Sequence, residues 1–63
     1  MNLEETIKYN GRLKIVTTNG NCKIGIIKNI EYSEELNEQV ITFIAVDDEY
    51  QFHKSEIESI EKV

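Results

Sequence analysis

The chain has 63 residues, of which 40% are hydrophobic and 30% are charged, and its formal net charge is −5 at pH 7. It contains neither the run of about 18 apolar residues of a membrane span nor a signal peptide, so we expect a cytoplasmic protein without membrane contact. Because it has one cysteine and one histidine, an internal disulfide and a cysteine-rich zinc site are excluded, and we expect no metal and no cofactor.

The first predicted element is a short helix within residues 1–11. Asn2 begins a capping-box pattern, and Gly11 is placed to end the helix as its C′ residue. Leu3 and Ile7 are four residues apart and therefore share one face. A helix of two turns is not stable alone, so we expect this face to pack against the rest of the protein.

From residue 12 onward the hydrophobic pattern changes to a period of two, which predicts strands. A first strand leads to Asn19-Gly20, a strong signal for a tight hairpin turn. A second strand is predicted over residues 21–32. Gly25 lies inside it and indicates a sharp bend or a close approach of two backbones.

The apolar residues of this second strand occupy alternate positions, and we expect them to face the core. This assignment makes Cys22 a buried, unreactive thiol and not a nucleophile. The alternating set comprises Cys22, Ile24, Ile26, Ile30 and Tyr32, with Lys28 as an interruption.

Residues 33–38 are polar and predict a connection to a third strand over residues 39–46. This strand is apolar on both faces and so needs cover on both, from the N-terminal helix or from another subunit. The remaining elements are a turn at Asp47-Asp48, a strand through Tyr50 and Phe52, one helical turn at Lys54–Glu56, and a last strand through Ile57 and Ile60.

A short helix followed by five strands, the second of them long and bent at a glycine, predicts a mostly β protein. We expect one domain over residues 1–63, with the helix at 1–11 and a strongly bent, five-stranded SH3-like small barrel at 12–63. Closure into a barrel would leave no long open edges.

The spacing of Asn19-Gly20 and Gly25 resembles that of Sm-like proteins, and Phe52 to Ile60 is similar to the short turn and last strand of that family. The resemblance covers nearly the whole chain and implies an Sm-like barrel. Glu34-Glu35 fall where the family has its uridine-binding residues, so the resemblance is to a divergent member without the usual uridine pocket.

The charges divide unevenly along the sequence. Residues 1–30 hold five basic and two acidic side chains, a net charge of +3, whereas residues 31–63 hold two basic and ten acidic ones, a net charge of −8. An acidic protein is not expected to bind duplex DNA. The asymmetry indicates either a solvated acidic half or a fold with a basic and an acidic end, through which copies could meet head to tail.

Five side chains are candidates for binding an anionic ligand. The turn before the last strand faces the pore or the subunit junction in Sm-like barrels, so the resemblance places Lys54 and His53 first. Lys23 follows the hairpin and is expected on the same outer surface as Arg12 and Lys14, which would form either an anion-binding patch or a solvated face. Candidates for stacking on a base are Tyr9, Tyr32 and Tyr50.

No pairing of a nucleophile with a base is indicated, and a domain of this size seldom encloses a catalytic pocket, so we do not expect an enzyme. The first hypothesis is a binding module that self-associates and binds single-stranded RNA or a small or cyclic nucleotide at subunit junctions. The alternative is an acidic adaptor or inhibitor, of the kind found among small bacterial and phage proteins, that docks a partner protein.

Overall fold

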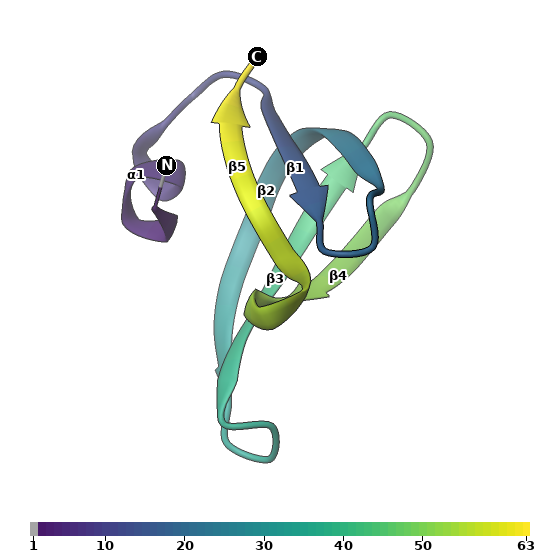
Figure 1. Cartoon of the computed structure of the whole chain (residues 1–63). Coiled ribbons are helices and arrows are strands. Elements are labelled where there is room, and N and C mark those ends of the chain that lie inside the picture. The colour runs from purple at the N-terminus through teal and green to yellow at the C-terminus, as the bar shows by residue number, and fades with distance from the viewer. Residues whose placement is uncertain (1) are drawn as a thin grey trace.

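The computed structural model describes residues 2–63; Met1, the first residue of the predicted helical segment, lies outside this range. The predicted order of elements is confirmed (Figure 1). The elements are α1 (Leu3–Lys8), β1 (Leu13–Thr17), β2 (Cys22–Ser33), β3 (Glu38–Ala45), β4 (Glu49–His53), the 3₁₀ turn η1 (Lys54–Glu56) and β5 (Ile57–Lys62).

The five strands form one antiparallel sheet in the order β4-β3-β2-β1-β5, which confirms the mostly β class. The sheet curves around a core, but β4 and β5 are its two edges and do not pair with each other (Figure 1). The predicted closure into a barrel is therefore not present in this sheet. β4 pairs only with β3, and β5 pairs only with β1. The three residues of η1 connect β4 to β5 along the chain, but no hydrogen-bonded ladder joins these two strands.

The start of α1 follows the prediction, but its end does not. The side-chain oxygen of Asn2 accepts a hydrogen bond of 2.9 Å from the backbone N–H of Glu5. The helix stops at Lys8 because Tyr9 has an extended backbone, with φ −86° and ψ 127°. Gly11 is thus not the C′ residue, and the helix is shorter than the segment 1–11.

The inward face of α1 also differs from the prediction. Ile7 is 67% exposed, whereas Thr6 is buried. Leu3 and Thr6 are three residues apart, so they share the face that looks toward the sheet. Leu3 and Tyr9 pack against the core cluster, which fixes α1 over the concave side of the sheet.

The core lies on the concave face of the sheet. The alternation predicted for the first strand is confirmed, since Leu13, Ile15 and Thr17 are buried while the residues between them are not. The other buried hydrophobic residues are Ile41, Phe43 and Ile60.

The hairpin between β1 and β2 is confirmed at Asn19-Gly20. Gly20 has φ +90°, a conformation that side chains rarely adopt, and its N–H donates to the carbonyl of Thr17 at 3.0 Å. The N–H of Thr17 donates in turn to the carbonyl of Asn21 at 2.8 Å, which leaves a three-residue loop.

The predicted inward face of β2 is wrong over its first half. Gly25 is buried and Ile27 is partly buried, whereas Cys22, Ile24 and Ile26 are exposed. The reason is the bend: the concave side of β2 approaches β3 so closely that only glycine fits, and alternation then sends the neighbouring isoleucines outward.

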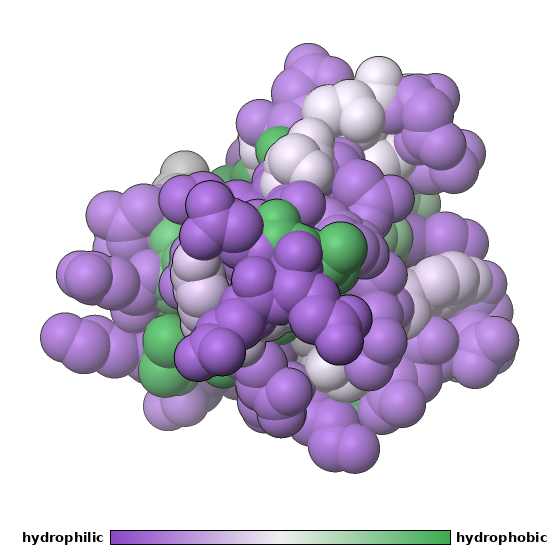
Figure 2. Space-filling model, turned by 90° about the horizontal axis from the view of Figure 1, so that it is seen from below, coloured by the Kyte–Doolittle hydropathy of each residue, from purple (hydrophilic) through white to green (hydrophobic). Residues whose placement is uncertain are grey.

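In the second half of β2 the prediction is confirmed for Ile30, which faces inward, and is wrong for Tyr32, which is 58% exposed near the β2–β3 turn. A bulge between Ile27 and Asn29 adds one residue to the strand, so that Ile30 lies opposite the buried Ile41. The β2–β3 hairpin projects beyond the rest of the sheet (Figure 1). The face of the molecule on this side is mostly hydrophilic, with hydrophobic side chains in small groups (Figure 2).

Within residues 2–63 there is no helix of the length and apolarity that a membrane crossing requires.

Candidate functional site

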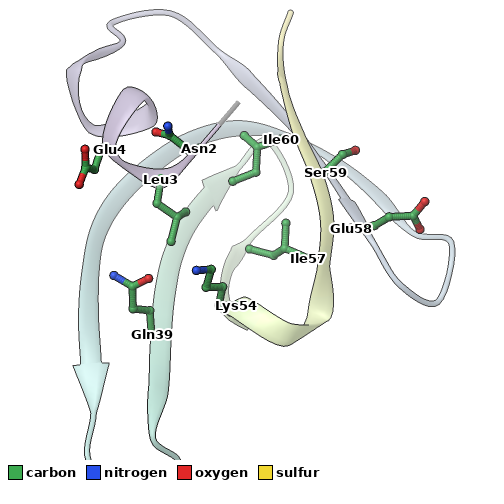
Figure 3. Close-up of a pocket in the computed structure, with 9 residues that line it drawn as sticks. All are labelled: Asn2, Leu3, Glu4, Gln39, Lys54, Ile57, Glu58, Ser59 and Ile60. Atoms are coloured by element: carbon green, nitrogen blue, oxygen red, sulfur yellow. The ribbon is translucent and has the colours of Figure 1, made fainter.

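A cavity of about 490 Å³ lies between α1, the start of β3, η1 and β5; we call it the helix pocket (Figure 3). Its apolar lining comes from Leu3, Ile57 and Ile60, and its polar lining includes Gln39 and Lys54. Figure 3 shows these five side chains pointing toward a common space. The volume falls within the range of about 300–1,000 Å³ that is usual for small-molecule sites.

The helix pocket combines one cation, an apolar wall and two amides, of which that of Asn2 already caps α1. Within residues 2–63 the ammonium of Lys54 takes part in no ion pair, so its charge is available to an incoming anion. The amide of Gln39 can both donate and accept a hydrogen bond. This set of groups fits a ligand that has a flat, weakly polar body, a polar edge and one negative charge.

Two carboxylates limit the charge that the pocket accepts. Glu4 and Glu58 lie at its rim, where both are exposed and Figure 3 shows their carboxylates directed away from the common space. Like charges close to one another are unfavourable, so these acids disfavour a ligand with several negative charges. The pocket therefore suits a singly charged anion better than a polyphosphate.

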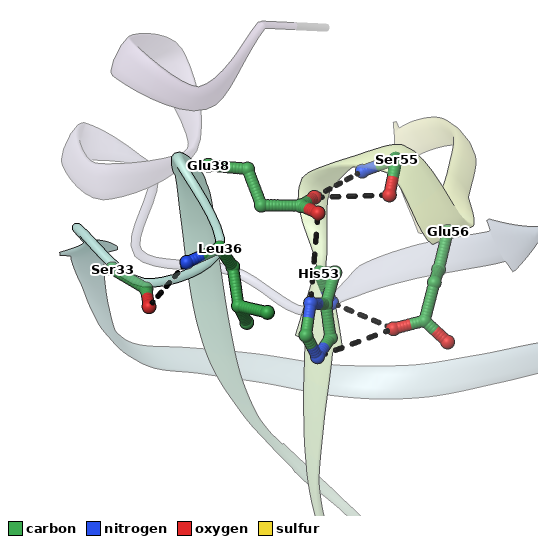
Figure 4. Close-up of polar contacts among 6 residues, drawn as sticks. All are labelled: Ser33, Leu36, Glu38, His53, Ser55 and Glu56. Atoms are coloured by element: carbon green, nitrogen blue, oxygen red, sulfur yellow. Dashed lines mark hydrogen bonds and ion pairs between the residues drawn. The ribbon is translucent and has the colours of Figure 1, made fainter.

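The position of Lys54 depends on a contact between η1 and β3. The carboxylate of Glu38 accepts two hydrogen bonds from Ser55, one from its backbone N–H at 3.1 Å and one from its hydroxyl at 2.9 Å (Figure 4). These two bonds hold the pKa of Glu38 below its usual value of 4.5, and the nearby His53 lowers the same pKa to a smaller extent. Glu38 thus anchors the turn that carries Lys54 to the first residue of β3.

His53 takes part in this anchor and is not among the residues that line the helix pocket. Its Nδ1 atom lies 3.7 Å from Glu38 and its Nε2 atom 3.9 Å from Glu56. The backbone N–H of His53 donates to Glu56 at 2.9 Å, which closes the turn like a helix cap. His53 thus lies between two carboxylates. Of the two highest-ranked candidates, only Lys54 lines the helix pocket.

A second, smaller cavity of about 200 Å³ lies between the β1–β2 turn and β4, and Lys23 and Tyr50 are among its lining residues. The ammonium of Lys23 lies 4.8 Å from the ring centroid of Tyr50, and Asp47 accepts from Lys23 at 3.2 Å and from the Tyr50 hydroxyl at 2.7 Å. Hydrogen bonding to Tyr50 and Asp47 raises the pKa of Lys23, and the same three-way contact lowers the pKa of Asp47. The charge of Lys23 is thus already paired.

The remaining predicted ligand residues are dispersed. Lys14 alternates with buried residues of β1 and faces outward, whereas Lys23 pairs with the buried Ile15 and lies on the opposite face, so the single basic surface predicted for them is not formed. Arg12 is exposed at the start of β1. Tyr9 contacts the ammonium of Lys62, and Tyr32 is hydrogen-bonded to Asn37 at the distant β2–β3 turn.

Two features of the helix pocket were not found from the sequence. Gln39 had no signal, because a polar residue at the start of a strand is usually solvated. The apolar lining was seen only as core, since Ile57 and Ile60 have the pattern of an ordinary strand. Two signals pointed to this place: the need of Leu3 for a packing partner, and the resemblance that ranked Lys54 first among the ligand candidates.

Residues 2–63 contain no group of three or more His, Cys, Asp or Glu side chains that could hold a metal ion. Comparisons of the chain with models of protein families, with curated proteins and with solved structures found no match.

Proposed function

We propose that this chain is a non-enzymatic binding module of the Sm-like type that takes a nucleotide-type ligand in the helix pocket. The supporting observation is the ammonium of Lys54 beside a cavity with an apolar wall of Leu3, Ile57 and Ile60. A base would lie against Leu3 and Ile57, the amide of Gln39 would contact its edge, and Lys54 would bind the phosphate.

The acidic residues at the pocket narrow the ligand class. A phosphodiester, as in single-stranded RNA or a cyclic nucleotide, carries one negative charge, whereas a nucleoside triphosphate would bring several toward Glu4 and Glu58. We therefore expect a phosphodiester to bind more tightly than a triphosphate with the same base.

The proposal includes self-association through the edges of the sheet. β4 and β5 each use only one side for pairing, and β5 also lines the pocket through Ile57 and Ile60. A neighbouring copy whose β4 paired with β5 would continue the sheet and lie next to the pocket. The ligand would then bind at a junction between subunits.

The experiment is calorimetric titration of the protein with a cyclic nucleotide, a short single-stranded RNA and a nucleoside triphosphate. We expect Lys54→Ala to weaken binding about tenfold or more, since a charge-assisted hydrogen bond contributes about 1–3 kcal/mol. Lys8→Ala is the matched control, because Lys8 is an exposed lysine outside the pocket.

Two outcomes would contradict the proposal at different points. Equal affinity of the parent and of Lys54→Ala for the ligand would show that the ligand binds outside the helix pocket. No binding of any of the three ligands by the parent would reject a nucleotide-type ligand and favour the acidic adaptor that docks a partner protein.

A further inference from the structure

The convex face of the sheet carries an exposed group of β-branched side chains. Ile24 and Ile26 of β2 are 39% and 47% exposed, Ile44 of β3 is 38% exposed, and Val46, directly after β3, is 89% exposed. Ile26 and Ile44 are direct partners across the two strands, and the adjacent pairing of Gly25 with Ala45 places Ile24 beside Val46. We call these four residues the outer patch.

The outer patch is left uncovered by the part of the chain that the structure describes. Helix α1 does not cover it, because α1 packs on the other side, where Leu3 and Tyr9 contact the core cluster. Isoleucine and valine are favoured on a half-buried pleated surface, and adjacent exposed apolar side chains of this kind mark interaction sites. Two faces of β3 therefore need cover, and the fold supplies it for only one.

The charges on either side of the outer patch have opposite signs along one row of the sheet. Ile44 pairs with Ile26 on one side and with Glu49 of β4 on the other. The β1–β2 ladder ends at the pair Leu13–Gly25, and Arg12 is one residue beyond it, so a continuation of the same register would place Arg12 beside Ile26. Across the convex face this row thus contains a cation, two isoleucines and an anion, in the order Arg12, Ile26, Ile44 and Glu49.

We propose that the outer patch is the contact between two copies of this chain, related by a two-fold axis that runs parallel to β2 and β3. Rotation about such an axis places β2 of one copy over β3 of the other and the Arg12 end of the row over its Glu49 end. Ile26 then packs on the partner copy's Ile44, and Arg12 faces the partner copy's Glu49. Both contacts occur twice, because the row is complementary to itself.

The other charged groups around the row are compatible with this contact. Glu49 now binds the ammonium of Lys28 at 3.3 Å, and both side chains are more than half exposed. A change of rotamer is enough to turn the carboxylate toward an opposing guanidinium. Lys14 has Glu61 as its cross-strand partner, so this neighbouring position adds no net charge to the face.

The size of the face sets the strength of the dimer. The contact is centred on β2 and β3; two strands about 4.8 Å apart, with about seven residues each at 3.3 Å per residue, cover roughly 220 Å². A stable interface buries about 800 Å² on each partner, so this contact forms a weak dimer that depends on concentration. It uses neither β4–β5 edge pairing nor the helix pocket, and is therefore independent of the function proposed above.

The first experiment is sedimentation equilibrium of the purified protein over a range of concentrations. The parent should show a monomer–dimer equilibrium, and Ile26→Lys and Val46→Lys should each weaken it at least tenfold. Val46 is almost fully exposed, so its substitution leaves the fold intact. Leu36→Lys is the matched control, because Leu36 is 50% exposed in the β2–β3 turn, and it should dimerise like the parent.

The second experiment tests the symmetry of the contact by charge reversal. Arg12→Glu and Glu49→Arg should each weaken the dimer, since each places like charges opposite one another. The double variant carries both changes in both copies and should recover the parent's dimerisation. This recovery is specific to a two-fold contact in which these two positions face each other.

Three results would overturn the proposal: a parent that remains monomeric at millimolar concentration, dimerisation that is unchanged by Val46→Lys, or a double variant no better than the single ones. Nucleotide titrations of Ile26→Lys should match those of the parent, since the helix pocket lies on the opposite face. A loss of ligand binding without loss of dimer, or the reverse, separates the two proposals.

Discussion

At Gly25 the backbones of β2 and β3 approach so closely that there is no room for a Cβ atom. A Cβ atom placed there would lie 2.0 Å from the carbonyl oxygen of Ile44 and 2.8 Å from the Cα atom of Ala45. Both are backbone atoms, so the neighbouring strand would have to move as a whole. This one position was predicted correctly from sequence, because a glycine inside a strand usually marks a bend or a close backbone approach.

Replacement of Gly25 by valine should cost stability and cooperativity. We expect Gly25→Val to lower the free energy of unfolding by about 1–3 kcal/mol or more, because overpacking forces the backbone of β3 away. Urea denaturation followed by circular dichroism measures the effect. Ile24→Val, at the exposed neighbour, should change the free energy by less than about 1 kcal/mol. A Gly25→Val curve identical to that of the parent would disprove the close approach.

Among the elements, η1 shows what sequence can and cannot predict. Its single turn at Lys54–Glu56 was predicted and is confirmed, since the local pattern of polar residues between two strands is sufficient. Its anchor was not predicted, because Glu38 and Ser55 are 17 residues apart and meet only through the pairing of β3 with β4. Hydrogen bonds of this kind follow from register, which a single sequence does not determine beyond the nearest hairpin.

The anchor of η1 should respond to acid. Ser55 lowers the pKa of Glu38, and a carboxyl group with a lower pKa in the folded state stabilises the fold above its unfolded pKa. That stabilisation is lost as the pH falls through the folded pKa, which lies below 4.5. In Ser55→Ala, we expect the pKa of Glu38 to rise toward its usual value, so that the loss begins at higher pH.

The measurement is an NMR titration of the Glu38 carboxyl carbon in the parent and in Ser55→Ala. Ser59→Ala provides the control, because Ser59 lies farther along β5, where it pairs with Val16 of β1. Because Ser55→Ala keeps the backbone N–H of residue 55, an unchanged pKa in this variant would show that the hydrogen bond from the Ser55 hydroxyl does not lower the pKa of Glu38.

At the scale of the whole molecule, the basic and acidic halves of the sequence do not form two ends. The strand order places β1 and β2, from the basic half, next to each other, and β3, β4 and β5, from the acidic half, on both sides of them. The net charges of +3 and −8 follow from the sequence, but the arrangement does not, because it depends on which strands are neighbours. The missing closure of the sheet escaped prediction for the same reason: alternation identifies strands and not their last pairing partner.

This arrangement makes self-association depend on salt in a specific way. β4 carries Glu49 and β5 carries Glu58, Glu61 and Lys62, so both edges have net negative charge. Edge pairing between copies should therefore strengthen with salt, as the screening length falls from about 10 Å at 0.1 M to about 3 Å at 1 M. The contact through the outer patch joins opposite charges and should weaken instead.

Light scattering of Ile26→Lys at increasing sodium chloride concentration measures edge pairing by itself, since this variant lacks the central contact of the outer patch. We expect its average mass to rise with salt. A mass that stays at the monomer value throughout would rule out edge pairing, and a mass that falls with salt would show that unlike charges, not screened like charges, hold the copies together.

The bulge at Lys28 has a consequence for how this protein can change in evolution. An extra residue in a strand ordinarily moves every later side chain to the other face. Here Ile27 pairs with Phe43 and Asn29 with Thr42, so the ladder continues as if Lys28 were not there. Loss of the bulged residue would therefore leave the buried side chains of both halves of β2 in phase, so this position tolerates a deletion that elsewhere in the strand would turn the core side chains outward.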